Sequence, residues 1–284
     1  MVTADFHIHS KHSTDGKSTL REHIEQALLK GLDTICFTEH YDYGNHNASH
    51  PLFLEEYNIS PDEASKSFIA DVPPYIAEVL DLKEEYKNRI SIRLGLELGL
   101  QPEIPEYFIK FADEHPFDFL IGSSHECGAL DPYYPDYLTG RTPMEAYRAY
   151  FTEEAHMAKN APQAFDVYGH ADYALRYNRP EGFEFHYSDF YDELDDFLKT
   201  IIENGKGIEV NTGGFRFFGS EPNPRIEILK RYKELGGEII TFGSDAHHYS
   251  ELARHFDKAA EILLALGYKY YFVFNERKGD ARLL

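Results

Sequence analysis

The sequence predicts an α/β protein whose parallel strands close into a barrel. Two features of the 284-residue chain support this fold class: short apolar runs alternate with helix-patterned stretches along its length, and these runs number seven or eight. The alternation is typical of parallel strands joined by crossover helices, and the number of repeats favours a closed barrel over an open sheet. Hydrophobic residues make up 42% of the chain, which is enough for a large core.

The expected strands are short runs of apolar or alternating residues. In chain order they are 4–9 (ADFHIH), 33–38, 90–98, 117–122, 165–169, 207–211 and 238–243, with an eighth at 269–274. The first run places His7 and His9 on one face, because successive side chains of a strand point to opposite faces.

The expected helices lie between these strands. Their ranges are 19–30, 74–88, 103–114, 143–159, 187–204, 223–235 and 250–266. Ser18-Thr19 before the first helix and Ser250 before the last are candidate N-cap signals, and Gly31 and Gly267 stand where C-caps belong. We expect two long loops, at 41–73 and 125–142. Both would lie at strand C-terminal ends, where barrel enzymes build their active sites.

Histidines and acids follow the C-terminal ends of six predicted strands. They are His7 and His9, Glu39 and His40, Glu97, His125, His170 and Asp172, and Asp245 and His247. Six of these histidines and the acids Asp15, Glu97 and Asp245 are enough to ligate two or three Zn²⁺, Mn²⁺ or Fe²⁺ ions. Glu97 stands between two leucines, and a lone buried carboxylate is costly unless it is paired or metal-bound.

The composition restricts the partners. A net charge of −21 at pH 7 argues against binding to nucleic acid, whereas a small anionic substrate stays compatible, because metal ions can reverse the field inside one pocket. The two cysteines indicate no disulfide framework, and no apolar run approaches the length of a membrane span. We expect a cytoplasmic protein with neither a membrane nor a nucleic acid as partner. Its oligomeric state stays open.

Six short motifs follow one another along the chain and contain most of its candidate metal ligands. They are HIHSKHSTDG, FTEH, LGLELG, SSHE, YGHADY and GSDAHH, and the ordered set resembles the PHP (polymerase and histidinol phosphatase) superfamily. The stretches DVYGHADYALRYN, EVNTGGFRF and YKYYFVFNERK are similar to its histidinol-phosphate phosphatase branch. The resemblance covers almost the full length, and we expect residues 1–284 to form a single PHP domain.

The resemblance implies a distorted (β/α)7 TIM-like barrel with three metal ions at the strand C-terminal ends. The implied ligands of the first ion are His7, His9, Glu97 and Asp245. Glu97 also bridges to a second ion, whose other ligands are His125 and His170. The third ion takes His40 and His247, and Asp15 stands where some relatives have a histidine. We expect two or three divalent ions of zinc, manganese or iron.

The resemblance also implies a reaction, the hydrolysis of L-histidinol phosphate to L-histidinol and phosphate in histidine biosynthesis. Two ions that share a water would supply the attacking hydroxide, so Glu97 and Asp245 would be catalytic as well as ligands. Arg176 and Arg216 match positions that look like phosphate contacts in that branch, and a planar guanidinium suits bidentate phosphate binding. The group that protonates the leaving alkoxide stays open between Asp245 and a water on the third ion.

Three alternative functions stay under consideration. The first is a PHP-type phosphoesterase that acts on another small phosphate ester. The second is an amidohydrolase-type barrel, which usually bridges its metals with a modified lysine, whereas no lysine closes a predicted strand here. The third is a non-catalytic PHP module of a polymerase, but the complete set of candidate metal ligands argues against this alternative.

Overall fold

The computed structural model describes residues 1–46, 50–177 and 179–284. Residues 47–49 of the predicted loop 41–73, and Asn178 at the end of DVYGHADYALRYN, therefore lie outside the described residues. Within the described ranges, no helix combines the length and the apolar character that crossing a membrane requires.

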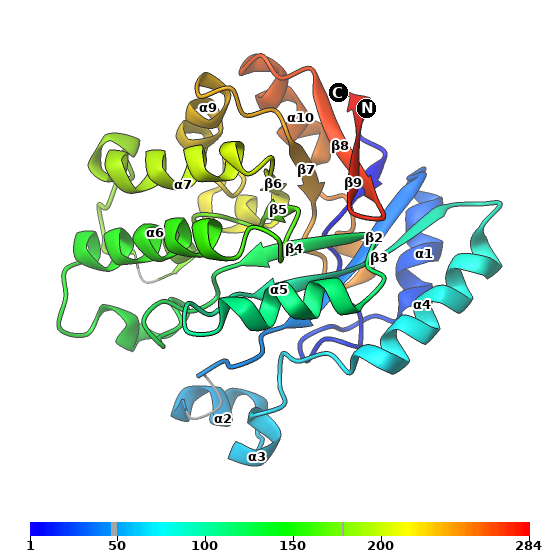
Figure 1. The fold of residues 1–284 in the computed structure, drawn as a ribbon, viewed down its shortest axis with the longest axis horizontal. Helices are drawn as coiled ribbons and strands as arrows, with labels where there is room; N and C mark the ends of the chain where they lie inside the picture. The colour runs from blue at the N-terminus through cyan, green and yellow to red at the C-terminus, as the bar shows by residue number, and fades with distance from the viewer. Residues whose placement is uncertain (47–49, 178) are drawn as a thin grey trace.

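Seven parallel strands form the predicted barrel. They are β1 (Ala4–Asp5), β2 (Thr34–Tyr41), β3 (Ser91–Gly99), β4 (Phe119–Ser123), β5 (Val167–Tyr168), β6 (Gly207–Asn211) and β7 (Ile240–Gly243), and each pairs with the next along the chain. The ring closes where the Phe6 amide donates to the Phe242 carbonyl (2.8 Å) and the Asp245 amide to the His7 carbonyl (2.9 Å). The C-terminal ends of all seven strands therefore meet at one end of the barrel. Figure 1 shows the sheet with helices around it.

Seven longer helices alternate with the strands, close to the predicted ranges. They are α1 (Leu20–Leu29), α4 (Val72–Tyr86), α5 (Pro105–Glu114), α6 (Pro143–Asn160), α7 (Tyr191–Glu203), α9 (Ile226–Glu234) and α10 (Phe256–Ala265). Thr19 caps α1 as predicted, because its hydroxyl accepts from the Glu22 amide while the Glu22 carboxylate accepts from the Thr19 amide. The prediction for Ser250 is wrong, since that residue lies in the 3₁₀ turn η6 (Tyr249–Glu251), before α10 begins.

The stretch 41–73 differs from the predicted loop, because it contains α2 (Pro51–Tyr57) and α3 (Pro61–Ala64). We call residues 50–68 the cap segment. Phe53 and Ala64 of the cap segment pack with Tyr134 in an apolar cluster that is separate from the main core. Tyr134 precedes the 3₁₀ turn η2 (Pro135–Leu138) within the other predicted loop. Figure 1 shows α2 and α3 apart from the main body of the barrel.

The strand predicted at 269–274 is present as β8 (Tyr270–Asn275), but it does not join the barrel. It pairs antiparallel with β9 (Lys278–Leu283), which the sequence did not predict. At the turn between them, the Arg277 amide donates to the Asp118 carbonyl (2.9 Å), and the Arg277 guanidinium donates to Asp166 (2.5 Å). Asp118 and Asp166 directly precede β4 and β5, so the hairpin covers the barrel end opposite to the strand C-termini.

Short helical turns follow two of the strands and carry the two arginines predicted to contact phosphate. After β5 comes η3 (Tyr173–Arg176), and after β6 come η5 (Thr212–Gly214) and α8 (Phe215–Phe218). A further turn, η4 (Tyr187–Phe190), leads into α7. The direction of each turn decides whether its arginine reaches the C-terminal end of the barrel.

Candidate metal centre

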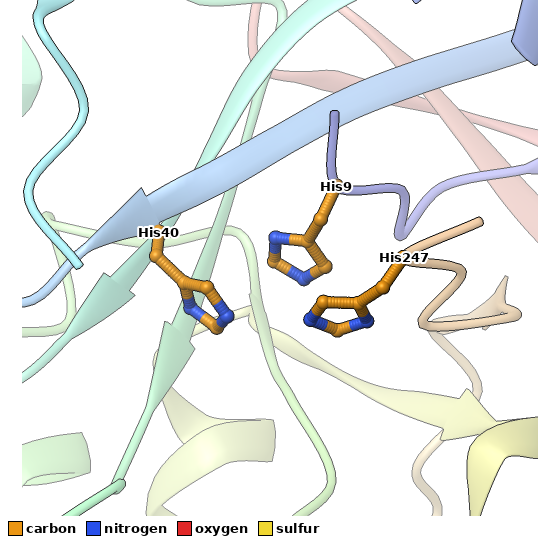
Figure 2. A group of neighbouring side chains, drawn as sticks. All are labelled: His9, His40 and His247. Atoms are coloured by element: carbon orange, nitrogen blue, oxygen red, sulfur yellow. The ribbon is translucent and has the colours of Figure 1, made fainter. Parts of the chain in front are cut away.

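Histidines from three separate segments converge at the C-terminal end of the barrel (Figure 2). His9 lies just beyond β1, His40 near the end of β2, and His247 beyond β7. The rings of His40 and His247 stack on the ring of His9, with centroid separations of 4.1 and 4.4 Å. One nitrogen of each imidazole lies within 4.8 Å of those of the other two, so the three side chains form a group that can hold a metal ion.

Glu97 occupies the centre of the site. Its side chain on β3 is fully buried, and both carboxylate oxygens face imidazole nitrogens. Oε1 lies 2.8 Å from His170 Nε2 and 3.2 Å from His125 Nε2. Oε2 lies 3.0 Å from His40 Nδ1, 3.3 Å from His7 Nε2 and 3.4 Å from His9 Nε2. Glu97 therefore contacts five of the six predicted histidine ligands, which is the arrangement that a bridging carboxylate requires.

Two aspartates extend the cluster on either side. Asp245 Oδ1 lies 3.5 Å from His9 Nε2 and 3.7 Å from His7 Nε2. Asp15 Oδ2 lies 2.9 Å from His247 Nε2 and 3.7 Å from His40 Nε2. The structure thus brings all nine predicted ligands together: His7, His9, Asp15, His40, Glu97, His125, His170, Asp245 and His247.

The chemistry of these donors fits divalent metal ions. Glu97 Oε2, Asp15 Oδ1 and His40 Nδ1 are buried and make no hydrogen bond with any described residue, although Glu97 Oε2 and His40 Nδ1 are close to each other. Buried polar atoms normally have a partner, and leaving them without one costs stability. Imidazole and carboxylate are the ligands that Zn²⁺, Mn²⁺ and Fe²⁺ accept, so these residues form a group that can hold divalent metal ions.

A second layer of acids, which the sequence did not predict as part of the site, orients the imidazoles. Glu209 on β6 lies 2.6 Å from His7 Nδ1 and accepts from the His170 amide (3.0 Å). Asp42 lies 2.8 Å from His125 Nδ1. Such partners fix the tautomer of a metal-binding histidine. The signal for Glu209 was available, because GIEVN places a single acid in an apolar strand, as GLEL does for Glu97.

The protonation of the cluster follows from its charges. Burial by itself would lower the pKa of His7, but Glu209, Glu97 and Asp245 raise it well above its usual value. Burial would likewise lower the pKa of His125, but Asp42 and Glu97 raise it to about 10. Burial would raise the pKa of Glu97, but the surrounding histidines hold it well below its usual value. Protons on the imidazoles therefore compete with metal ions for the same nitrogens.

Arg176 lies beside the clustered histidines and acids. Its buried guanidinium donates from Nη1 to Asp245 Oδ2 (3.3 Å) and from Nε to Asn223 Oδ1 (2.7 Å). Nη2 is buried and makes no hydrogen bond with a described residue. The guanidinium also lies against the rings of Tyr173 and Phe217. A fixed cation therefore stands directly beside the metal ligands.

Arg216 does not reach the site. Its guanidinium lies 3.3 Å from Glu251 Oε1, its side chain is 38% exposed, and it is absent from the described lining of the cavity beside the metal ligands. The helical turn α8 directs this side chain toward η6 instead. The geometry therefore supports a phosphate contact for Arg176 and gives none for Arg216.

A cavity of about 210 Å³ opens beside the metal ligands. Arg176 is the one arginine or lysine among the described residues that line it. Its aromatic lining includes Phe53, Phe68, Tyr173 and Tyr177, and its acidic lining beyond the ligands includes Asp42, Glu56 and Asp131. The cavity therefore presents a metal-binding wall with one arginine, and aromatic and acidic walls around it.

Known proteins resemble this chain over most of its length. The PHP domain family matches residues 5–213. A histidinol-phosphatase from Lactococcus lactis subsp. lactis (strain IL1403) is 29% identical over 283 residues, covering 99% of this chain and 97% of the relative. A crystal structure of histidinol phosphate phosphatase from Lactococcus lactis, complexed with zinc, L-histidinol and phosphate, is 28% identical with a TM-score of 0.81, covering 98% of each chain. A structure from Listeria monocytogenes, 18% identical with a TM-score of 0.74 over 89% of this chain and 98% of that one, shows the same fold.

Proposed function

The chain belongs to the PHP domain family, and we propose that it is a metal-dependent phosphatase that hydrolyses L-histidinol phosphate to L-histidinol and phosphate in histidine biosynthesis. The observation that carries this proposal is the position of Glu97 among five imidazoles, beside a cavity that also contains Arg176. Similarity to histidinol-phosphatase over nearly the full chain supports the choice of substrate.

We assign the nine clustered residues to two or three divalent ions. His7, His9, Glu97 and Asp245 would hold the first, and Glu97, His125 and His170 the second. His40, His247 and Asp15 would hold the third, and His9 also lies close enough to contribute to this group. When bound, such ions lower the pKa of a water molecule and neutralise charge on a phosphoryl group. The metal identity and the number of ions are part of the proposal.

Arg176 would bind the phosphoryl group. Its Nη2 is a donor that the protein leaves without a hydrogen bond among the described residues, beside the cavity. A guanidinium that is already held in place needs no reorganisation as negative charge develops on phosphoryl oxygens. Asp245 accepts hydrogen bonds from Arg176 and Asn211 through Oδ2, and both contacts favour its ionised form. We therefore assign Asp245 as a ligand and anchor of Arg176 rather than as the acid for the leaving group.

The remaining walls fit the rest of the substrate. L-Histidinol carries an ammonium group and an imidazole, which are complementary to carboxylates and to aromatic faces. Glu56 and Asp131 supply the carboxylates, and Tyr173 and Tyr177 supply rings on the same side as Arg176. A second candidate function is hydrolysis of another small phosphate ester, which the same metal ligands and Arg176 would serve.

The test is phosphate release from L-histidinol phosphate, p-nitrophenyl phosphate and a nucleoside monophosphate, with metal-depleted protein repleted with Mn²⁺ or Zn²⁺. We expect a large preference for L-histidinol phosphate in kcat/KM, which His170→Ala abolishes. Equal weak activity on all three esters would leave the proposed phosphatase activity standing but would overturn L-histidinol phosphate as the substrate. The single domain over residues 1–284, the cytoplasmic location and the absence of nucleic-acid and membrane partners stay predictions.

A further inference from the structure

We propose that Asn223 is a positioning residue that aligns Arg176, and that Asp172 fixes the orientation of the Asn223 amide. The three side chains form a line in which each hydrogen bond determines the direction of the next. The inference rests on the proposed function only in that it assumes a phosphate group as the ligand of Arg176. Asn223 and Asp172 are absent from the described lining of the cavity, so they act through Arg176.

The guanidinium of Arg176 needs an acceptor at Nε to hold its plane. Nη1 donates to Asp245 Oδ2 at 3.3 Å, and this oxygen also accepts from the Asn211 side chain. Nε donates to Asn223 Oδ1 at 2.7 Å. The shorter contact is therefore the one to Asn223. With both of these groups engaged, Nη2 is the nitrogen of Arg176 that makes no hydrogen bond with a described residue, and Arg176 lines the cavity.

The orientation of the Asn223 amide follows from its neighbour. Asn223 Nδ2 donates to Asp172 Oδ1, and the other carboxylate oxygen of Asp172 accepts from the Arg225 amide (2.9 Å). A reversed amide would place Oδ1 against the carboxylate and Nδ2 against the guanidinium, so acceptors would face acceptors and donors would face donors. Asp172 therefore directs Oδ1 of Asn223 at Arg176.

The backbone also holds Asn223 in place. Its amide donates to the Asn211 carbonyl (2.9 Å), and the Asn211 amide donates to the Asn223 carbonyl (2.7 Å), at the last residue of β6. Gly214 allows this approach, because a Cβ at that position would lie 2.4 Å from the Asn223 nitrogen. Asn223 is fully buried, so its side chain has little freedom to turn away from Arg176.

The experiment is a double-mutant cycle read by calorimetric titration of inorganic phosphate into the zinc-loaded protein. We compare wild type, Arg176→Ala, Asn223→Ala and the double variant. We expect Asn223→Ala to weaken phosphate binding roughly tenfold, as for loss of a hydrogen bond to a charged group. In the Arg176→Ala background the same change should have no further effect. Asn204→Ala, at an exposed position, is the matched control.

Asp172→Asn is the second variant, because it is isosteric and changes the carboxylate that accepts from the Asn223 side chain and from the Arg225 amide. We expect it to weaken phosphate binding in the same direction, again only when Arg176 is present. The proposal is overturned if either variant folds with full zinc content and binds phosphate as wild type does, or if their effects persist without Arg176. Failure to hydrolyse L-histidinol phosphate would instead overturn the proposed function, since the titration needs no turnover.

Discussion

Glu97 and Glu209 show how two acids in similar sequence settings take different roles. Each stands in an apolar strand and is almost completely buried. Glu97 directs both oxygens at imidazole nitrogens that can ligate metal, whereas Glu209 contacts His7 from the opposite ring nitrogen. A carboxylate in the second position raises the basicity of the histidine and holds its ring. The two glutamates are therefore expected to respond differently to substitution.

Glu209→Gln should lower metal affinity without abolishing it. The amide keeps the size of the side chain but removes the charge that favours Nδ1 protonation of His7. Loss of such a partner typically costs 10- to 100-fold in metal affinity. Competition with a chromogenic chelator measures this change, with the exposed Glu84→Gln as control. Unchanged affinity in Glu209→Gln would show that His7 needs no orienting carboxylate.

Substitution of Arg176 and substitution of Arg216 should have different effects on the kinetic constants. Arg176→Ala removes a buried donor at the cavity and should raise KM for a phosphate monoester about tenfold or more. Arg216→Ala removes an ion pair with Glu251 outside the cavity and should change kcat/KM less than about twofold. Zinc content should stay intact in both variants. An effect of Arg216→Ala as large as that of Arg176→Ala would restore the role predicted for Arg216 from the sequence.

His23 should make stability fall in acid. Burial lowers its pKa to about 4 in the folded chain, against about 6.5 when unfolded. The unfolded chain therefore binds a proton first as the pH falls, so the contribution is complete above pH 6.5 and declines toward pH 4. Between pH 7 and pH 5 the loss is about 2 kcal/mol. Urea unfolding at both pH values should show a smaller difference in His23→Leu, and equal differences would contradict this.

At the scale of elements, the cap segment is a separate unit placed over the site. Phe53, Ala64 and Tyr134 form their own apolar cluster, and Phe53 also lines the cavity. Segments with few buried contacts open at a lower free energy than the main core. Substrate affinity should therefore depend on a cluster that contributes little to global stability.

Leu54→Ala tests this dependence, because Leu54 packs on the cluster but is absent from the described lining of the cavity. Removal of this partly buried side chain should cost about 1–2 kcal/mol within the cap segment. We expect KM to rise several-fold, with metal content and the global unfolding temperature unchanged. Hydrogen exchange in residues 50–68 should increase. A drop in unfolding temperature with unchanged KM would place Leu54 in the main core instead.

The sequence predicted the long helices and missed the short helices α2 and α3 for a physical reason. A helix such as α6 repeats its apolar face over several turns, whereas α2 and α3 are seven and four residues long. Their signals were N-caps followed by proline at His50-Pro51 and Ser60-Pro61. β9 was missed because its side chains are mostly exposed and carry no apolar alternation.

The cluster of candidate ligands was predictable because metal chemistry restricts ligands to a few residue types at strand ends. The roles of Glu209, Asp42 and Asn223 depend on which side chains face them from other strands, and one chain in isolation does not reveal this. Arg216 is a residue for which the sequence predicted a contact at the site that the structure does not show. Its position after β6 suggested the cavity, but the turn of α8 directs it to Glu251.

At the scale of the whole molecule, the barrel concentrates charge at one end. Six of the nine histidines and acids in the cluster are buried, within a chain of net charge −21. The β8–β9 hairpin covers the opposite end, and backbone hydrogen bonds of Phe6, His7 and His9 to the segment around β7 close the ring of seven strands. Two of the proposed metal ligands, His7 and His9, therefore also take part in the closure of the barrel, and metal binding should stabilise the complete fold.

Removal of metal should lower the unfolding temperature of the whole chain. An ion that binds only the folded state contributes about 4 kcal/mol at a concentration a thousandfold above its Kd. For a chain of 284 residues, whose unfolding entropy is about 0.6 kcal/mol/K, that corresponds to a shift of roughly 7 °C. Calorimetric scans before and after chelation, and after repletion with Zn²⁺ or Mn²⁺, measure the shift. Glu97→Gln should abolish most of it, because Glu97 contacts five of the histidines. A chelation shift as large in Glu97→Gln as in wild type would mean that the stabilising ion binds elsewhere.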